Sequence, residues 1–406
     1  MQPLPTSNIP ALGRFQQQAL VIGVVALVAG ASGAAMNLDQ FFRSWLIGFL
    51  FCLSLALGSL ALLMIQHLSG GQWGLVSRRV FEAASGTLPV ISVLFIPLLF
   101  GMPRIFEWAR PEAVQADPIL QMKVAYLNVG FFIARAAIYF ACWIGCMWLL
   151  NTWSTAQDRG EGLTKIDSIR FRKVSAPGLL ILVLAVTFAS VDWIMSLEPD
   201  WFSTIFGLLT VVGYGLTALA FTVVVLSKLH RDPAARAYLT PRHFHDLGKL
   251  MLAFTMLWAY LSFSQFLIIW SGNLPEEIPW YIARVRGSWG VVAIALVVGH
   301  FALPFALLLS ASLKKRSATL ARVATLILVM RLVDLIWYVV PSFRHSTGQE
   351  GGAAHVPMIP FHWMDIAIPV GLVGLWIFLF VRQFRAKALF PVNDPYFKEI
   401  FAHEAH

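Results

Sequence analysis

The sequence predicts an all-α integral membrane protein with ten transmembrane helices, and two observations carry that prediction. The first is composition: 58% of the 406 residues are hydrophobic and only 13% are charged, against about 25% charged in a typical soluble protein. So few charges could not cover a soluble body of 45.1 kDa. The second is a series of ten apolar stretches, each long enough to cross the roughly 30 Å hydrocarbon core of a bilayer as a helix.

The apolar stretches follow one another along the whole chain, so we treat residues 1–406 as one polytopic membrane domain. The first stretch, with Ala31-Ser32-Gly33-Ala34-Ala35 after it, resembles a signal peptide, and we expect it to remain as a helix. Residues 386–406 are expected to form a cytoplasmic tail. We expect membrane spans near 15–35, 42–66, 86–106, 128–152, 174–196, 203–228, 246–271, 288–312, 318–341 and 363–385.

Loop charges predict the orientation. Most of the 30 Lys and Arg residues fall in loops on the side that carries both termini. Because cytoplasmic loops are enriched in Lys and Arg, we expect the N- and C-termini in the cytoplasm, and an even number of spans agrees. The net charge of +9 is therefore attributed to topology and to contact with anionic lipids. No nucleic-acid partner is expected, since no basic domain remains outside the spans.

The sequence contains no motif for a cofactor of its own. P-loop, Rossmann, HExxH and CxxCH patterns are missing from it. Its three cysteines, Cys52, Cys142 and Cys146, all lie in apolar stretches and could not hold an iron–sulfur cluster. We therefore expect no metal site and no bound cofactor, so any electron transfer must use the centres of other subunits.

Ionisable residues inside the spans are the candidate functional groups, because each costs several kcal/mol in hydrocarbon unless it is paired or hydrated. Arg331 and Asp334 are spaced i, i+3 and can pair on one helix face. Structural ion pairs and packed donors are the alternative interpretation for this group. The candidates for a proton pathway are Asp192, Asp334, Arg331 and His300 within the spans, and His245 and Asp246 at the cytoplasmic end of the seventh span. A further pair, His362 and Asp365, is expected at a membrane interface.

A weak internal echo indicates a repeat. Val191-Asp192-Trp193-Ile194 ends the fifth span, and Val333-Asp334-Leu335-Ile336 lies in the ninth. The two segments are four spans apart and run in the same direction. This spacing fits two four-helix bundles, spans 2–5 (42–196) and spans 6–9 (203–341), with spans 1 and 10 beside them.

Three segments taken together resemble a known family. They are Ala189–Pro199 (ASVDWIMSLEP), Gln265–Pro279 (QFLIIWSGNLPEEIP) and Phe390–Pro395 (FPVNDP). The combination is similar to the polysulfide-reductase-type (NrfD-like) membrane subunits, specifically the smaller of the two in bacterial alternative complex III. That resemblance covers essentially the whole chain.

The resemblance implies a subunit of a quinol:cytochrome c (or other periplasmic acceptor) oxidoreductase in the bacterial inner membrane. It implies a proton-conducting or quinone-proximal role, and no redox centre in this chain. The implied partners are a periplasmic iron–sulfur subunit, multihaem and monohaem cytochromes c, a larger NrfD-like sister subunit and lipids. Candidates for a quinone pocket are Arg135, Asp192, Gln265 and Asp334. The alternatives are a structural anchor for periplasmic redox subunits and a secondary transporter.

Overall fold

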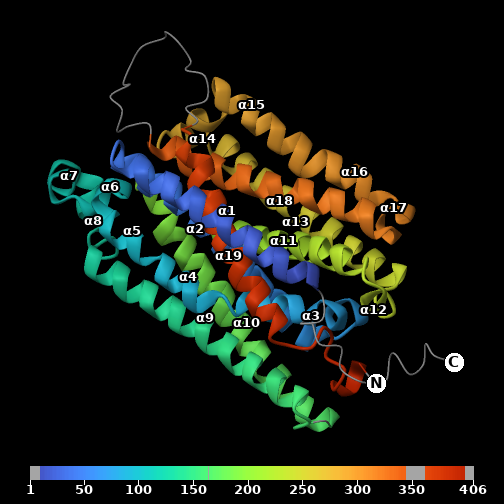
Figure 1. The fold of residues 1–406 in the computed structure, drawn as a ribbon. Coiled ribbons are helices and arrows are strands. Elements are labelled where there is room, and N and C mark those ends of the chain that lie inside the picture. Colours follow the sequence, from blue (N-terminus) through green and yellow to red (C-terminus); the bar gives the residue numbers. More distant parts are fainter. Residues whose placement is uncertain (1–9, 163, 344–361, 398–406) are drawn as a thin grey trace.

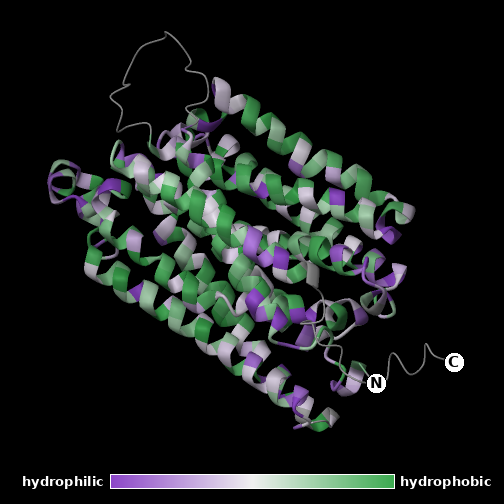
Figure 2. Ribbon diagram, in the orientation of Figure 1, coloured by the Kyte–Doolittle hydropathy of each residue, from purple (hydrophilic) through white to green (hydrophobic). Residues whose placement is uncertain are grey.

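The chain is an all-α, multi-pass membrane protein. A computed structural model describes residues 10–162, 164–343 and 362–397. Within these ranges there is no strand, and ten runs of helix are long and apolar enough to cross a membrane. The prediction of ten spans is confirmed. Hydrophobic residues extend along the helices, and hydrophilic ones gather mainly towards the two ends of the bundle (Figure 2). Most of the loop near 341–362, and residues 398–406 of the tail, lie outside the described ranges.

Most spans are single long helices, and short helices connect them. The unbroken spans are α1 (Pro10–Ala34), α2 (Leu38–Ser69), α9 (Val129–Asp158), α11 (Phe206–Leu229), α13 (Pro241–Gly272) and α19 (Met364–Arg385). The fifth and ninth spans end in 3₁₀ turns, as α10 (Lys165–Trp193) with η3 (Met195–Leu197) and α18 (Ser317–Val339) with η5 (Val340–Phe343). The connecting helices are α6 (Met102–Ile105), η2 (Glu107–Ala109), α7 (Pro111–Ala116), α8 (Pro118–Lys123), α12 (Pro233–Arg236), α14 (Ile278–Val285) and α17 (Ala311–Lys315).

The spans run side by side, so the bundle has two ends (Figure 1). We call the end where α1 begins and α19 finishes the base; it is at the lower right of Figure 1. The opposite end carries α6, α7, α8 and α14. Helices α1 and α19 are antiparallel neighbours, because Gly13 lies near Arg385 at the base and Gly33 lies near Met364 at the opposite end.

The third span differs from its prediction. It runs from Gln72 to Phe100, whereas a span near 86–106 was expected. It consists of α3 (Gln72–Ser85), α4 (Leu88–Leu94) and α5 (Ile96–Phe100). The charged residues of α3 lower the hydropathy of this segment, so the span was predicted to begin after it. In the structure these charges are buried in ion pairs within the protein. Pro89 and Pro97 occupy the first turns of α4 and α5, where a proline ends the preceding helix.

The eighth span contains a π-helical turn. It consists of α15 (Ser288–Ala295), η4 (Leu296–Ala302) and α16 (Leu303–Leu309), of which η4 is π-helix. Pro304 cannot donate a hydrogen bond to the carbonyl of His300, and its ring would clash with that carbonyl in a regular α-helix. A wider turn before the proline relieves the clash. Such π-helical turns occur frequently at functional sites.

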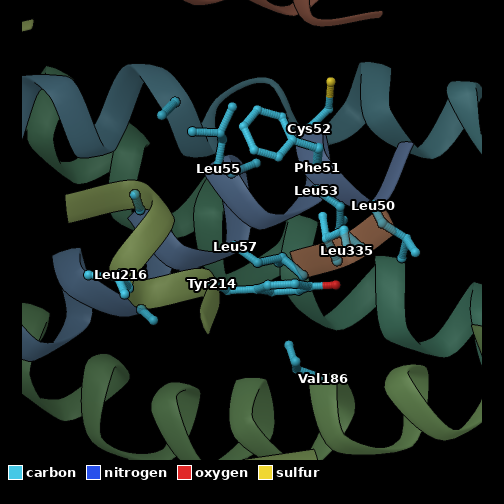
Figure 3. Close-up of a cluster of buried hydrophobic side chains, with 14 of the residues drawn as sticks. Leu50, Phe51, Cys52, Leu53, Leu55, Leu57, Val186, Tyr214, Leu216 and Leu335 are labelled. Atoms are coloured by element: carbon cyan, nitrogen blue, oxygen red, sulfur yellow. The ribbon is translucent and has the colours of Figure 1, made fainter. Parts of the chain in front are cut away.

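Helix α2 forms the centre of the molecule. Every residue of its apolar stretch is buried inside the protein, and it packs against α10, α11 and α19. Figure 3 shows part of this core, with residues of α2, Val186 of α10, Tyr214 of α11 and Leu335 of α18. The helix is therefore shielded from lipid by its neighbours, and close packing around it matters for stability.

Helices α2 and α11 approach closely at Gly58. A Cβ atom at position 58 would lie 2.0 Å from the carbonyl oxygen of Tyr214, far inside van der Waals contact. We expect Gly58→Ala to push the two helices apart and to lower the free energy of unfolding by about 1–3 kcal/mol or more. Thermal unfolding of the purified chain measures this effect. The control is Gly145→Ala, since nothing lies within 4 Å of a Cβ there and Ala is the better helix former. Equal Tm values for the two variants would contradict the close approach.

Candidate functional site

A cavity of about 660 Å³ opens among α13, α14, the eighth span and α18. Its walls are largely aromatic and aliphatic, and Trp258, Trp337 and Tyr338 contribute flat ring surfaces. Tyr260 and Phe263 also line it while being 66% and 61% exposed. The cavity therefore opens sideways, towards the surface that faces acyl chains when the protein is in a membrane. Its volume is within the range of about 300–1,000 Å³ that is usual for sites of small organic ligands.

Asp334 lies on the wall of this cavity and is 1% exposed. One carboxylate oxygen, Oδ2, accepts a hydrogen bond from Nη1 of Arg331, one turn earlier in α18. The other, Oδ1, has no hydrogen-bond partner among the described residues. The Trp258 indole approaches this carboxylate, but its N–H has no partner in bonding geometry either. A buried carboxylate oxygen without a donor is costly, so Oδ1 keeps an unused capacity to accept a hydrogen bond.

Arg331 holds this carboxylate in place from the protein side. Its Nε donates to the hydroxyl of Thr217 at 3.3 Å, and its guanidinium lies where a side chain at Gly213 would lie. The sequence prediction that Arg331 and Asp334 pair is confirmed by the structure. The pair leaves Oδ1 of the acid without a hydrogen-bond partner among the described residues.

Gln265 supplies a second polar group to the cavity. It is 2% exposed; its Nε2 donates to the Tyr281 hydroxyl at 3.3 Å, and its Oε1 accepts from the Ser203 hydroxyl at 3.2 Å. Tyr281, in α14, also lines the cavity. Burial raises the pKa of Tyr281 to about 12, so its hydroxyl stays protonated at neutral pH and can donate a hydrogen bond. Gln265 was predicted from the sequence as a pocket residue, whereas Tyr281 was not.

His300 lies behind the cavity wall. It is fully buried in η4, and neither ring nitrogen has a hydrogen-bond partner among the described residues. Its ring packs on Trp258, with 3.9 Å between the ring centroids. His300 does not line the cavity itself, and Trp258 lies in contact with both.

Arg135 and Asp192 form a separate, closed site between α9 and α10. Arg135 donates to both oxygens of Asp192, from Nε at 2.9 Å and from Nη2 at 2.8 Å. The Tyr139 hydroxyl donates to Oδ2 at 2.9 Å. The Arg135 guanidinium also stacks on the ring of Tyr126, 3.9 Å from its centroid. Both carboxylate oxygens are thus occupied, and neither residue lines the large cavity.

His245 and Asp246 lie at the base, as expected from their place at the start of the seventh span. Asp246 Oδ1 is 3.4 Å from Nζ of Lys249 and 4.0 Å from Nδ1 of His245. Twelve positions of α13 separate Asp246 from Trp258, which is about 18 Å along a helix. The structure therefore does not bring these two residues into contact with the cavity. The pair His362–Asp365 lies at the opposite end, where the Asp365 carboxylate accepts a hydrogen bond from the backbone N–H of His362.

The base also holds a buried ion network that was not predicted from the sequence. Glu82 of α3 accepts hydrogen bonds from Arg78, Arg79 and Lys387, at 2.9, 2.8 and 3.0 Å. Arg78 also donates to Asp394 at 2.7 Å, within the Phe390–Pro395 segment. Burial lowers the pKa of the Lys387 amine and Glu82 opposes that shift. The network fixes the segment after α19 against the base of the bundle.

A scan against protein-family models found no match to the chain, and a search of the curated proteins found none either.

Proposed function

We propose that the chain is a membrane subunit of a quinol:cytochrome c (or other periplasmic acceptor) oxidoreductase, with no redox centre of its own, and that it binds quinol in the cavity beside Asp334. The observation that carries this proposal is the free Oδ1 of Asp334 on the wall of an aromatic cavity that opens towards lipid. An isoprenoid quinol is a largely apolar molecule with two hydroxyl groups on its ring. It would reach such a cavity from the bilayer and need an acceptor inside it.

The chemistry follows from that geometry. Oxidation of a quinol to the quinone releases two protons and two electrons. Asp334 would accept a hydroxyl proton directly or through one water, within about 2.6–3.2 Å, while Arg331 keeps the carboxylate oriented. Gln265 and Tyr281 would hold the second ring oxygen. The electrons would leave through the iron–sulfur and haem centres of periplasmic partners.

The predicted orientation agrees with this route. With both termini in the cytoplasm, the cavity would lie in the periplasmic half of the second bundle, spans 6–9. A periplasmic iron–sulfur subunit docked at the end that carries α14 would then be the nearest electron acceptor. His300 and the His245–Asp246 pair remain candidates for proton transfer outside the cavity, whereas Asp192 has donors on both oxygens.

One observation favours the structural-anchor alternative. The Arg135–Asp192–Tyr139 site is closed, and both oxygens of its carboxylate have donors. If both carboxylate oxygens of Asp334 also had donors, Asp334 and Asp192 would both be interpreted as structural residues. Its free oxygen is what favours quinol binding over a purely structural role.

Blocking the cavity tests the proposal. Ala293 lines the cavity, whereas Ala295, two residues later in α15, does not line it and is exposed. We expect Ala293→Trp to fill the space and to weaken binding of a quinone analogue at least about tenfold, and Ala295→Trp to leave it unchanged. Photoreactive ubiquinone and menaquinone analogues, followed by mapping of the labelled peptides, measure this binding in the full chain.

The labelled peptides also test the location. Label on α13 and α18 that is lost in Ala293→Trp supports the proposal. Label elsewhere, or labelling that is the same in both variants, contradicts it.

A further inference from the structure

A group of lysines at the base lies outside the proposed quinol site. Lys314 and Lys315 end α17, the short helix between the eighth and ninth spans, and Lys249 lies in the third turn of α13. Helices α13 and α17 pack against each other. We call Lys249, Lys314 and Lys315 the lysine cluster.

Lys314 is the inner member of the lysine cluster. Its aliphatic stem lies over Gly248, where an added Cβ would be 2.7 Å from Cγ of Lys314. The residue is 6% exposed, although it lies at the end of the bundle. No acidic side chain pairs with it among the described residues. Burial lowers the pKa of the Lys314 amine, and the charge of Lys249 lowers it further. Two neighbouring cations repel each other, and an anion that joins both relieves the repulsion.

The charges of the lysine cluster are balanced only in part by the residues that the structure describes. All three lysines act electrostatically on His245, and the carboxylate that opposes them there is that of Asp246. Asp246 is 3.4 Å from the amine of Lys249. Three amines against one carboxylate leave two positive charges in excess. This excess attracts an anion with several acceptor oxygens, such as a phosphate group.

The surroundings of the lysine cluster are apolar on the side of the membrane. Leu257 of α13 and Leu309 of α16 are 42% and 59% exposed, and α13 packs against α16. A free phosphate ion would gain nothing from this surface. A phospholipid would cover it with acyl chains while its phosphate reaches the lysines.

We propose that the lysine cluster binds the phosphate of an anionic phospholipid whose acyl chains lie along α13 and α16. Basic pockets between transmembrane helices bind the head groups of anionic lipids in this way. The site does not depend on the quinol proposal, since no residue of the cluster lines the cavity.

Native mass spectrometry of the full chain, with any partners that copurify, tests the assignment. The probes are phosphatidylglycerol, phosphatidylcholine and inorganic phosphate. We expect Lys314→Met to weaken phosphatidylglycerol binding about fivefold, the effect of one lysine near an anionic lipid. Asp246→Asn should strengthen it, because it removes the opposing carboxylate. Lys173→Met, an exposed lysine in the first turns of α10 at the same end, should change nothing.

The outcomes separate the sources of the anion. Weaker phosphatidylglycerol binding in Lys314→Met, with unchanged phosphatidylcholine binding, supports a lipid site. The same loss in Lys173→Met overturns the assignment to the lysine cluster. Retention of inorganic phosphate that depends on Lys314, without lipid dependence, overturns the assignment to a lipid. Lys249→Met, at an exposed position, gives the same test if Lys314→Met does not fold.

Discussion

Replacing Asp334 by Asn is expected to lower quinol oxidation by the assembled complex at least about 100-fold, the usual contribution of a positioned general base. Asn keeps the size of the side chain but cannot take a proton at neutral pH. The free Oδ1 of Asp334 is the acceptor for the quinol hydroxyl in our proposal, so its proton affinity is what the substitution removes. The rate of quinol oxidation and the number of protons released per electron pair, measured per assembled complex, report the effect.

Asp192→Asn is the comparison for that experiment. Asp192 is as buried as Asp334, but its oxygens already accept from Arg135 and Tyr139. We expect this variant to lower the Tm, because it breaks a buried ion pair, and to leave the rate per assembled complex near that of the unmodified protein. The opposite pattern, with loss of rate in Asp192→Asn alone, would place quinol oxidation at the Arg135–Asp192 site.

Replacing Glu82 by Gln is expected to lower the free energy of unfolding by about 3–5 kcal/mol, the cost of removing one partner from a buried ion pair. Glu82 is 2% exposed and compensates Arg78, Arg79 and Lys387 at once. Gln has a similar shape but no charge, so the three cations would remain buried with less compensation. Thermal unfolding of the purified chain in detergent measures the effect.

Glu161→Gln is the control for this second substitution. The Glu161 side chain is 64% exposed, and among the described residues its ion pair is with Arg159, so its removal should change the free energy of unfolding by less than about 0.5 kcal/mol. If Glu82→Gln unfolds at the same temperature as Glu161→Gln, the buried network does not stabilise the base. Faster proteolysis of the segment after α19 in Glu82→Gln would show that the network holds that segment in place.

The ten spans could be predicted because length and apolar composition depend on local sequence alone. The contact between Arg331 and Asp334 was predictable for the same reason, since an i, i+3 spacing places both on one face of a helix. The start of the third span was not predictable, because three charged residues, Arg78, Arg79 and Glu82, are typical of a loop exposed to water. Only their tertiary partners show that they are buried. Local hydropathy carries no information on such partners.

The site depended on contacts between distant parts of the chain. Arg135 and Asp192 are 57 positions apart and form a bidentate pair, so two residues of the predicted quinone pocket compensate each other instead of lining the cavity. Gln265 and Asp334 do line it, but the sequence could not show that Tyr281 and Trp258 join them. Such cavities arise from the packing of several helices, which no single stretch encodes.

The position of α2 has a consequence for biogenesis. This segment leaves the ribosome before α11 and α19, which cover it in the finished molecule. It must therefore partition into lipid by itself at first, and its strongly apolar sequence meets that requirement although its apolar stretch is later buried inside the protein. Each helix that arrives afterwards displaces lipid from its surface, and α19 is the last of them. A nascent chain halted before α19 would leave part of the apolar surface of α2 uncovered, where chaperones and membrane proteases could recognise it.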